Sequence, residues 1–173
     1  MRNGVMLVIA ALCTSGLIAY ATGAEEQQLT VDERLKRIDD FMHDRPSFLQ
    51  KQSLQEFRGL AKLRGEKIEK VPNRHVAGEM LEYRQLQFNG LELYGHVTSS
   101  QEFSPIVVTV TTPTWKLARG LDVGTPAGRI EALLGPPMVK TDMLLEYQGT
   151  SDIVKFHVER DVIRRIELIY YHD

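Results

Sequence analysis

The residues that could do chemistry in this chain are few and stand apart from one another. His157 and Glu159 come nearest to a metal-ligand or acid-base pair, because alternate residues of a strand point to the same face. Ligand histidines normally occur in spaced sets, and the polar outer face of an amphipathic strand is the alternative that we favour for this pair. The histidines are all single: His43, His75, His96, His157 and His172. We therefore predict no metal site and no cofactor.

Motifs of the common enzyme classes are also missing from the sequence. It contains no Gly-x-Ser-x-Gly, His-Glu-x-x-His, Walker A or Gly-x-Gly-x-x-Gly pattern, which would mark a nucleophile, a zinc site or a phosphate loop. The single cysteine, Cys13, falls within an apolar N-terminal run. We predict that the protein is not an enzyme.

Aromatic and arginine residues indicate a site for binding another protein. Trp115, the only tryptophan, lies close to Arg119 in a segment between two predicted halves, and Trp and Arg are enriched at binding hot spots. Packing of Trp115 over the seam between the halves is the alternative. Tyrosines could line a sheet face that grips a partner, or form cross-strand pairs that only stabilise the sheet. The candidate protein-binding residues are Trp115, Arg119, Tyr94, Tyr170 and Tyr171.

Composition and charge exclude two classes of protein. The 173 residues include 21 Lys and Arg against 23 Asp and Glu, a net charge of -2, so no overall field favours binding to nucleic acid. A hydrophobic content of 43% is too high for a chain that cannot collapse. We expect one ordinary globular domain or two very small ones.

Residues 1–24 have the layout of a secretory signal peptide. Arg2 precedes an apolar run from Val5 to Ala21, and no charged residue follows before position 25. We predict export to the bacterial periplasm, with cleavage after Ala21 or Ala24; an uncleaved inner-membrane anchor is the alternative. Because the remaining chain has no cysteine, we expect no disulfide partner.

Periodicity predicts helices and then strands in the first half. The capping boxes that begin at Thr30 and Ser53 predict helix starts at these positions. Asp44-Arg45-Pro46 should end the first helix and Gly65 the second. Strands are predicted over 81–88, 91–97 and 106–112, with a tight hairpin at Asn89-Gly90. Apolar residues change parity within 81–88, so we expect a bulge or bend there.

The same order of elements returns after residues 114–120. Thr125 is predicted to cap a helix, with Pro126 at its first position and Gly135 at its end. Strands follow around 145–147, 154–158 and 166–170, with a turn at Arg160-Asp161.

We therefore predict an α+β fold of two tandem units, each a helix plus a three-stranded antiparallel meander, with the helices covering one face of the sheet or sheets. The predicted segments are a signal peptide (1–24), an N-terminal helical segment (25–52), the first unit (53–113), a linker (114–120) and the second unit (121–173). Joining the meanders edge to edge would remove exposed strand edges, and we expect this arrangement.

A motif in the second unit resembles a known family. Gly124, Ile130, Leu134, Gly135 and Pro137 match the Gly-helix-Leu-Gly-x-Pro pattern of the SmpA/OmlA (BamE-like) family of small outer-membrane assembly lipoproteins. The tandem arrangement is also similar to that of the β-lactamase inhibitor protein. The resemblance implies an exported, non-catalytic, protein-binding module.

Three functions remain open at this point. The first is a scaffold or assembly factor that binds another protein of the bacterial cell envelope, with peripheral membrane association kept as an alternative. The second is a proteinaceous inhibitor or immunity protein of a periplasmic hydrolase, as the second similarity implies. The third is a hydrolase or small-ligand binder that uses His157, Glu159 or the tyrosines.

Overall fold

The computed structural model describes residues 29–171. The predicted signal peptide with its two cleavage sites, Cys13 and His172 lie outside the described residues. Within the described range, every helix is too short or too polar to span a membrane.

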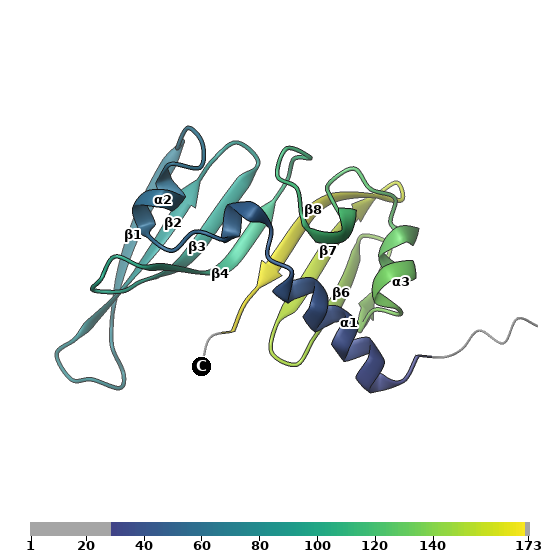
Figure 1. Ribbon diagram of the computed structural model, residues 1–173, viewed down its shortest axis with the longest axis horizontal. Helices are drawn as coiled ribbons and strands as arrows, with labels where there is room; N and C mark the ends of the chain where they lie inside the picture. Colours follow the sequence, from purple (N-terminus) through teal and green to yellow (C-terminus); the bar gives the residue numbers. More distant parts are fainter. Residues whose placement is uncertain (1–28, 172–173) are drawn as a thin grey trace, which may run out of the picture.

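Strands with alternating apolar residues build one antiparallel sheet, in which β4 pairs with β8 through residues 107–110 and 166–169. The first half contributes β1 (Gly65–Pro72), β2 (Met80–Gln87), β3 (Leu91–Val97) and β4 (Phe103–Val110). The second half contributes β5 (Val139–Lys140), β6 (Leu144–Gln148), β7 (Ile153–Glu159) and β8 (Val162–Ile169). The order across the eight-stranded sheet is β1-β2-β3-β4-β8-β7-β6-β5, as Figure 1 shows.

The predicted fold of two helix-plus-three-strand units is wrong. The structure is mostly a single eight-stranded sheet with few, short helices, and β1 and β5 are strands that the sequence analysis missed. The edge-to-edge junction that we expected is present between β4 and β8, but it merges the halves into one sheet rather than joining two separate helix-covered meanders.

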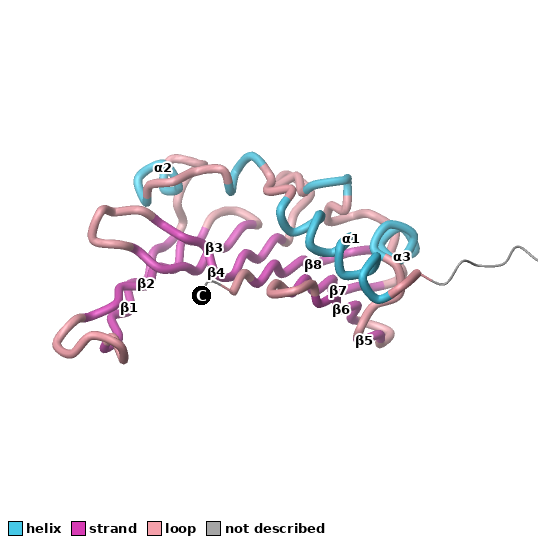
Figure 2. The backbone as a smooth tube through the Cα atoms, turned by 60° about the horizontal axis from the view of Figure 1, so that its bottom comes forward, coloured by secondary structure: helices cyan, strands magenta, loops and turns pink. Residues whose placement is uncertain are grey.

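The helices lie along one side of this sheet (Figure 2). They are α1 (Val31–His43), α2 (Leu54–Arg58) and α3 (Gly128–Leu134), with 3₁₀ turns at 47–49 and 118–120. The sheet arches, and the β1–β2 hairpin and β5 bend away from the helices, so that the opposite side is concave. We call this side, which carries none of the described helices, the open face.

α1 packs on the second half of the sheet. Its capping box at Thr30 and its end at His43 are as predicted. Phe41 lies 6.1 Å from Phe156 of β7, between ring centroids. Asp39 accepts hydrogen bonds from the amide and hydroxyl of Thr150, at 2.8 and 2.6 Å, which fixes the helix to the β6–β7 turn.

Three local predictions need correction. The second helix ends at Arg58 and not near Gly65, because Leu60 and Leu63 pack against the core from a turn. α3 begins at Gly128, with Ala127 at its N-cap; the Thr125 hydroxyl instead donates to the Gly120 carbonyl. β4 begins at Phe103, before the point where the prediction started it.

Of the bulge or bend predicted in 81–88, the bulge is absent. β2 keeps a regular register with both neighbours, and the register shift lies between Tyr94 and Gly95 on β3, where that strand pairs with β4. A Cβ at Gly95 would come within 2.2 Å of the Ser104 carbonyl oxygen, so this close approach needs glycine. The parity change within 81–88 therefore has another origin, described below.

Candidate functional site

The open face presents the alternate residues of each strand that do not enter the core. Along β3, Leu91, Leu93 and Val97 are buried under the helical side, whereas Tyr94 and His96 face the other way and remain partly exposed. The same alternation turns Leu86 of β2 into the core and Tyr83 to the open face. The open face is thus an uncovered surface with aromatic side chains of its own.

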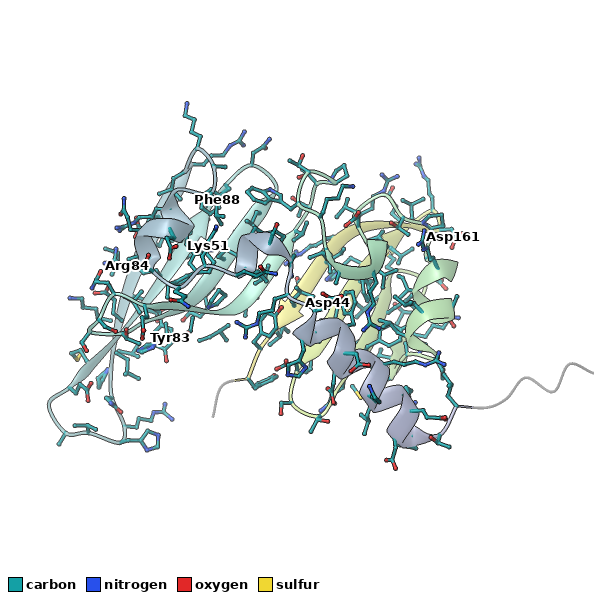
Figure 3. The ribbon with its side chains drawn as sticks, in the orientation of Figure 1. Asp44, Lys51, Tyr83, Arg84, Phe88 and Asp161 are labelled. Atoms are coloured by element: carbon teal, nitrogen blue, oxygen red, sulfur yellow. The ribbon has the colours of Figure 1, made fainter. Side chains whose placement is uncertain are left out.

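An aromatic cluster occupies the first half of this face. The rings of Tyr83 and Tyr94 stack with centroids 5.6 Å apart and planes 7° from parallel. His96 meets Tyr83 edge-on, also at 5.6 Å. Partial burial, together with the nearby carboxylate of Glu69, raises the pKa of Tyr94. Tyr94 is therefore a neutral hydrogen-bond donor at neutral pH. Figure 3 shows Tyr83 on β2 beside Arg84.

An apolar row continues this cluster across the junction of the two halves. The strand register places Tyr94 opposite Val107, Val107 opposite Ile169, and Ile169 opposite Ile153. Tyr171 has the same parity as Ile169 and is 57% exposed. The row crosses the middle of the sheet, where β4 meets β8.

A recess borders the aromatic cluster at the base of the β1–β2 hairpin. It has a volume of about 640 Å³. Its lining residues are Val71, Pro72, Arg74, His75, Leu81 and Tyr83. The recess combines an apolar floor with basic and imidazole groups from the hairpin, so it can receive an apolar side chain next to a polar or acidic one.

Ion pairs occupy the open face of the second half. Lys155 lies 2.9 Å from Glu146, and Arg165 pairs with Glu167. His157 lies 3.5 Å from the same Glu167 carboxylate. These charges largely neutralise one another, so this half forms a polar margin to the apolar row.

The structure does not bring His157 and Glu159 together as a metal or acid-base site. Glu159 lies 3.8 Å from Arg160 and 3.9 Å from Arg164, near the β7–β8 turn. Among residues 29–171, no group of three or more His, Cys, Asp or Glu side chains is placed to hold a metal ion.

Trp115 and Arg119 lie on the helical side, away from the open face. The Trp115 indole donates to the Asn89 carbonyl at 2.8 Å, and its ring packs 5.4 Å from Phe48 and 6.1 Å from Phe88. Arg119 is exposed, and its guanidinium lies 3.9 Å from Asp44. Trp115 therefore holds the linker against the core through the N-terminal segment and the first half, and these contacts do not reach the second half.

The two adjacent tyrosines near the C-terminus point in opposite directions. Tyr171 lies on the open face, but Tyr170 is 4% exposed and enters the core side under the guanidinium of Arg45. Burial raises the pKa of Tyr170 to about 12, with nearby Arg45 opposing and Asp152 adding to the shift. Of the five candidate binding residues, only Tyr94 and Tyr171 share the open face.

Sequence reasoning missed most of the open-face cluster: Tyr83, His96, Val107, Ile153 and Ile169. The usable signal was the parity change in residues 81–88. Leu81 and Tyr83 face outward and Leu86 faces inward, so both parities are apolar because both faces of β2 carry apolar groups. A second apolar face on a regular strand explains the pattern without a bulge.

No family model, no curated protein and no solved structure matches this chain. The resemblance to the assembly lipoproteins and to the inhibitor therefore stays a prediction.

Proposed function

We propose that this protein is a non-catalytic binding module of the bacterial cell envelope, and that it binds a partner protein through the open face of its sheet. The observation that carries the proposal is the stacked Tyr83–Tyr94 pair on a face that no helix of residues 29–171 covers. Exposed apolar patches with polar margins mark interaction sites in soluble proteins.

The chemistry of the face favours a protein partner. Tyrosine supplies a large contact area at a small cost in side-chain entropy, because only two torsions are fixed. The stacked pair is already ordered before binding, and the ion pairs of the second half provide a hydrated margin around the apolar row. The partner should present an apolar or aromatic protrusion with acidic groups for Arg74 and His75.

The experiment compares two double variants in affinity capture from native envelope extract. Tyr83→Ala/Tyr94→Ala should reduce the recovered partner at least tenfold, since aromatic hot spots each contribute about 2 kcal/mol. Met138→Ala/Met143→Ala is the matched control, because it also removes two exposed apolar side chains, 52% and 72% exposed, outside the cluster. It should leave recovery unchanged.

Urea unfolding of both variants establishes that each is folded before capture. If the folded tyrosine variant recovers the same partner as the wild type, while the methionine variant loses it, the open face is not the binding site.

The inhibitor remains the second candidate, because the loop 73–79 of the β1–β2 hairpin projects from the molecule (Figure 1) and its Val76 is 50% exposed. In this case the recovered partner would be one soluble hydrolase, bound one to one and inactivated by the chain. A scaffold would instead be recovered with membrane assemblies, and enzyme rates would not change.

A further inference from the structure

β1 is a long strand edge that the described residues leave unpaired. It spans eight residues and pairs only with β2, at the margin of the molecule in Figure 1. The other edge strand, β5, has only two residues. Residues 67–70 of β1 are all exposed, and Ile68 is 56% exposed. Such an edge is a template for another strand.

The backbone groups that face outward can be assigned. The Asn73 amide donates to the Glu79 carbonyl at 2.9 Å, and in this register residues 73 and 79 are direct partners. Because hydrogen-bonding direction alternates along an antiparallel strand, odd-numbered residues turn toward β2. Glu66, Ile68 and Lys70 therefore turn their backbone N–H and C=O groups to the free edge. Pro72 is the last residue of this series, and it lacks an N–H.

Residues at equal distances on either side of Ile68 carry opposite charges. Glu66 and Lys67 precede it, and Glu69 and Lys70 follow it. In an antiparallel pair of two identical strands with Ile68 at the centre, Lys67 of each copy lies opposite Glu69 of the other. Glu66 likewise lies opposite Lys70. Every charge then meets its opposite, and the two isoleucines meet each other.

We propose that two copies of this protein associate through β1, antiparallel, with Ile68 on the two-fold axis. The central residues then form a hydrogen-bonded pair, and Glu66 and Lys70 form the flanking pairs through their outward backbone groups. The arrangement is a closed, isologous dimer, and it extends each eight-stranded sheet into its copy.

Other registers are disfavoured by the same charges. If the pairing of the two strands shifts by two residues, either the two Lys67 residues or the two Glu69 residues lie opposite each other. Directly opposed like charges destabilise a strand pair. A slip by one residue places Lys67 opposite Lys70. The charges of this edge therefore favour the register centred on Ile68 over the neighbouring registers.

Lys67, Glu69 and Lys70 have exposed side chains for the pairing, whereas Glu66 also holds its ion pairs with Arg58 and Arg84. The Lys67 side chain forms no ion pair or hydrogen bond with the described residues, and Lys70 lies at 3.6 Å from Glu82 with 61% of its side chain exposed. The two-fold axis of this dimer is perpendicular to the sheet, so the open faces of the two copies lie on the same side of the dimer. The inference goes beyond the proposed function, since the dimer forms without the partner.

Disulfide trapping tests the register. Opposed residues of a hydrogen-bonded pair have Cα atoms about 5.5 Å apart, within the range for a disulfide. In full chains carrying Cys13→Ser, Ile68→Cys should form a covalent dimer under mild oxidation. Val76→Cys, 50% exposed on the same hairpin, is the control and should stay monomeric. Equal dimerisation of both variants, or capture of another protein by Ile68→Cys, overturns the proposal.

Charge reversal tests the chemistry by sedimentation equilibrium of the full chain. Lys67→Glu should weaken the dimer about tenfold, because symmetry converts two attractive cross-strand pairs into two repulsive ones. Glu69→Lys should act similarly, and Lys67→Glu/Glu69→Lys should restore association. If the double variant is as weak as either single variant, or if all four chains are monomers, the proposal is wrong.

Discussion

Two buried tyrosines differ in whether the hydroxyl has a partner. Tyr147 is fully buried, and its hydroxyl donates to the Gly135 carbonyl at 3.2 Å; the Tyr170 hydroxyl is buried without a hydrogen bond to the described residues. Burial raises the pKa of both groups, so both hydroxyls are protonated at neutral pH. Only one of them contributes a bond that stabilises the fold.

Tyr147→Phe should therefore lower the free energy of unfolding by about 1 kcal/mol, because it leaves a buried carbonyl without its donor. Tyr170→Phe removes an unpaired polar group and should be neutral or slightly stabilising. Urea denaturation at pH 7 measures both. An equal loss in the two variants would show that the Tyr170 hydroxyl has a bond after all.

The sequence identified candidate binding residues by their type, but it did not predict to which face of the sheet their side chains point. Sequence reasoning named Tyr94 and Tyr171, which do face the open side, but it grouped them with Trp115 and Tyr170, which pack on the other side. Tyr170 and Tyr171, which directly follow β8, continue its alternation and point to opposite sides. One sequence does not say which of the two faces a helix covers, so the five residues could not be sorted in advance.

A ladder of ion pairs stabilises the end of the sheet that α2 is too short to cover. Glu66 of β1 lies 2.6 Å from Arg58 of α2 and 2.7 Å from Arg84 of β2. Arg84 continues the ladder to Glu82 at 2.6 Å. Burial disfavours the charged form of Glu66, but the hydrogen bonds from the two arginines outweigh this effect and lower its pKa.

A carboxylate with a lowered pKa stabilises the folded state above its ordinary pKa, and the stabilisation is lost as pH falls. Glu66→Gln should therefore reduce stability at pH 7 and flatten the decline between about pH 5 and about pH 3. Urea denaturation across that range is the measurement. A decline as steep as that of the wild type would assign the acid sensitivity to other carboxylates.

Elements with strong local signals were predicted correctly, and elements without them were not. The capping boxes at Thr30 and Ser53 start helices as expected, and Asn89-Gly90 forms the hairpin, with Gly90 at φ 74°. β1 was missed because it is an edge strand whose exposed run buries little, so no apolar alternation marks it. β5 is too short to carry a pattern.

At the scale of the whole molecule, the two faces of the sheet differ in what covers them. The helical side holds the core, including the linker with Trp115, and the open face keeps an apolar row from Tyr94 to Ile153 across the β4–β8 junction. We expected from the sequence that the halves join edge to edge, but we did not predict which residues share the face across the junction, because pairing between β4 and β8 joins residues far apart in the chain. The continuous face exists only in the merged sheet.

Site-specific photo-crosslinking in intact cells tests the central claim most directly. A photoreactive residue at Tyr94 or Val107 on the open face should crosslink the chain to one and the same partner protein. The same residue at Arg129, exposed on α3 of the helical side, should not. Crosslinks to a partner from Arg129, with none from Tyr94 or Val107, would contradict binding through the open face.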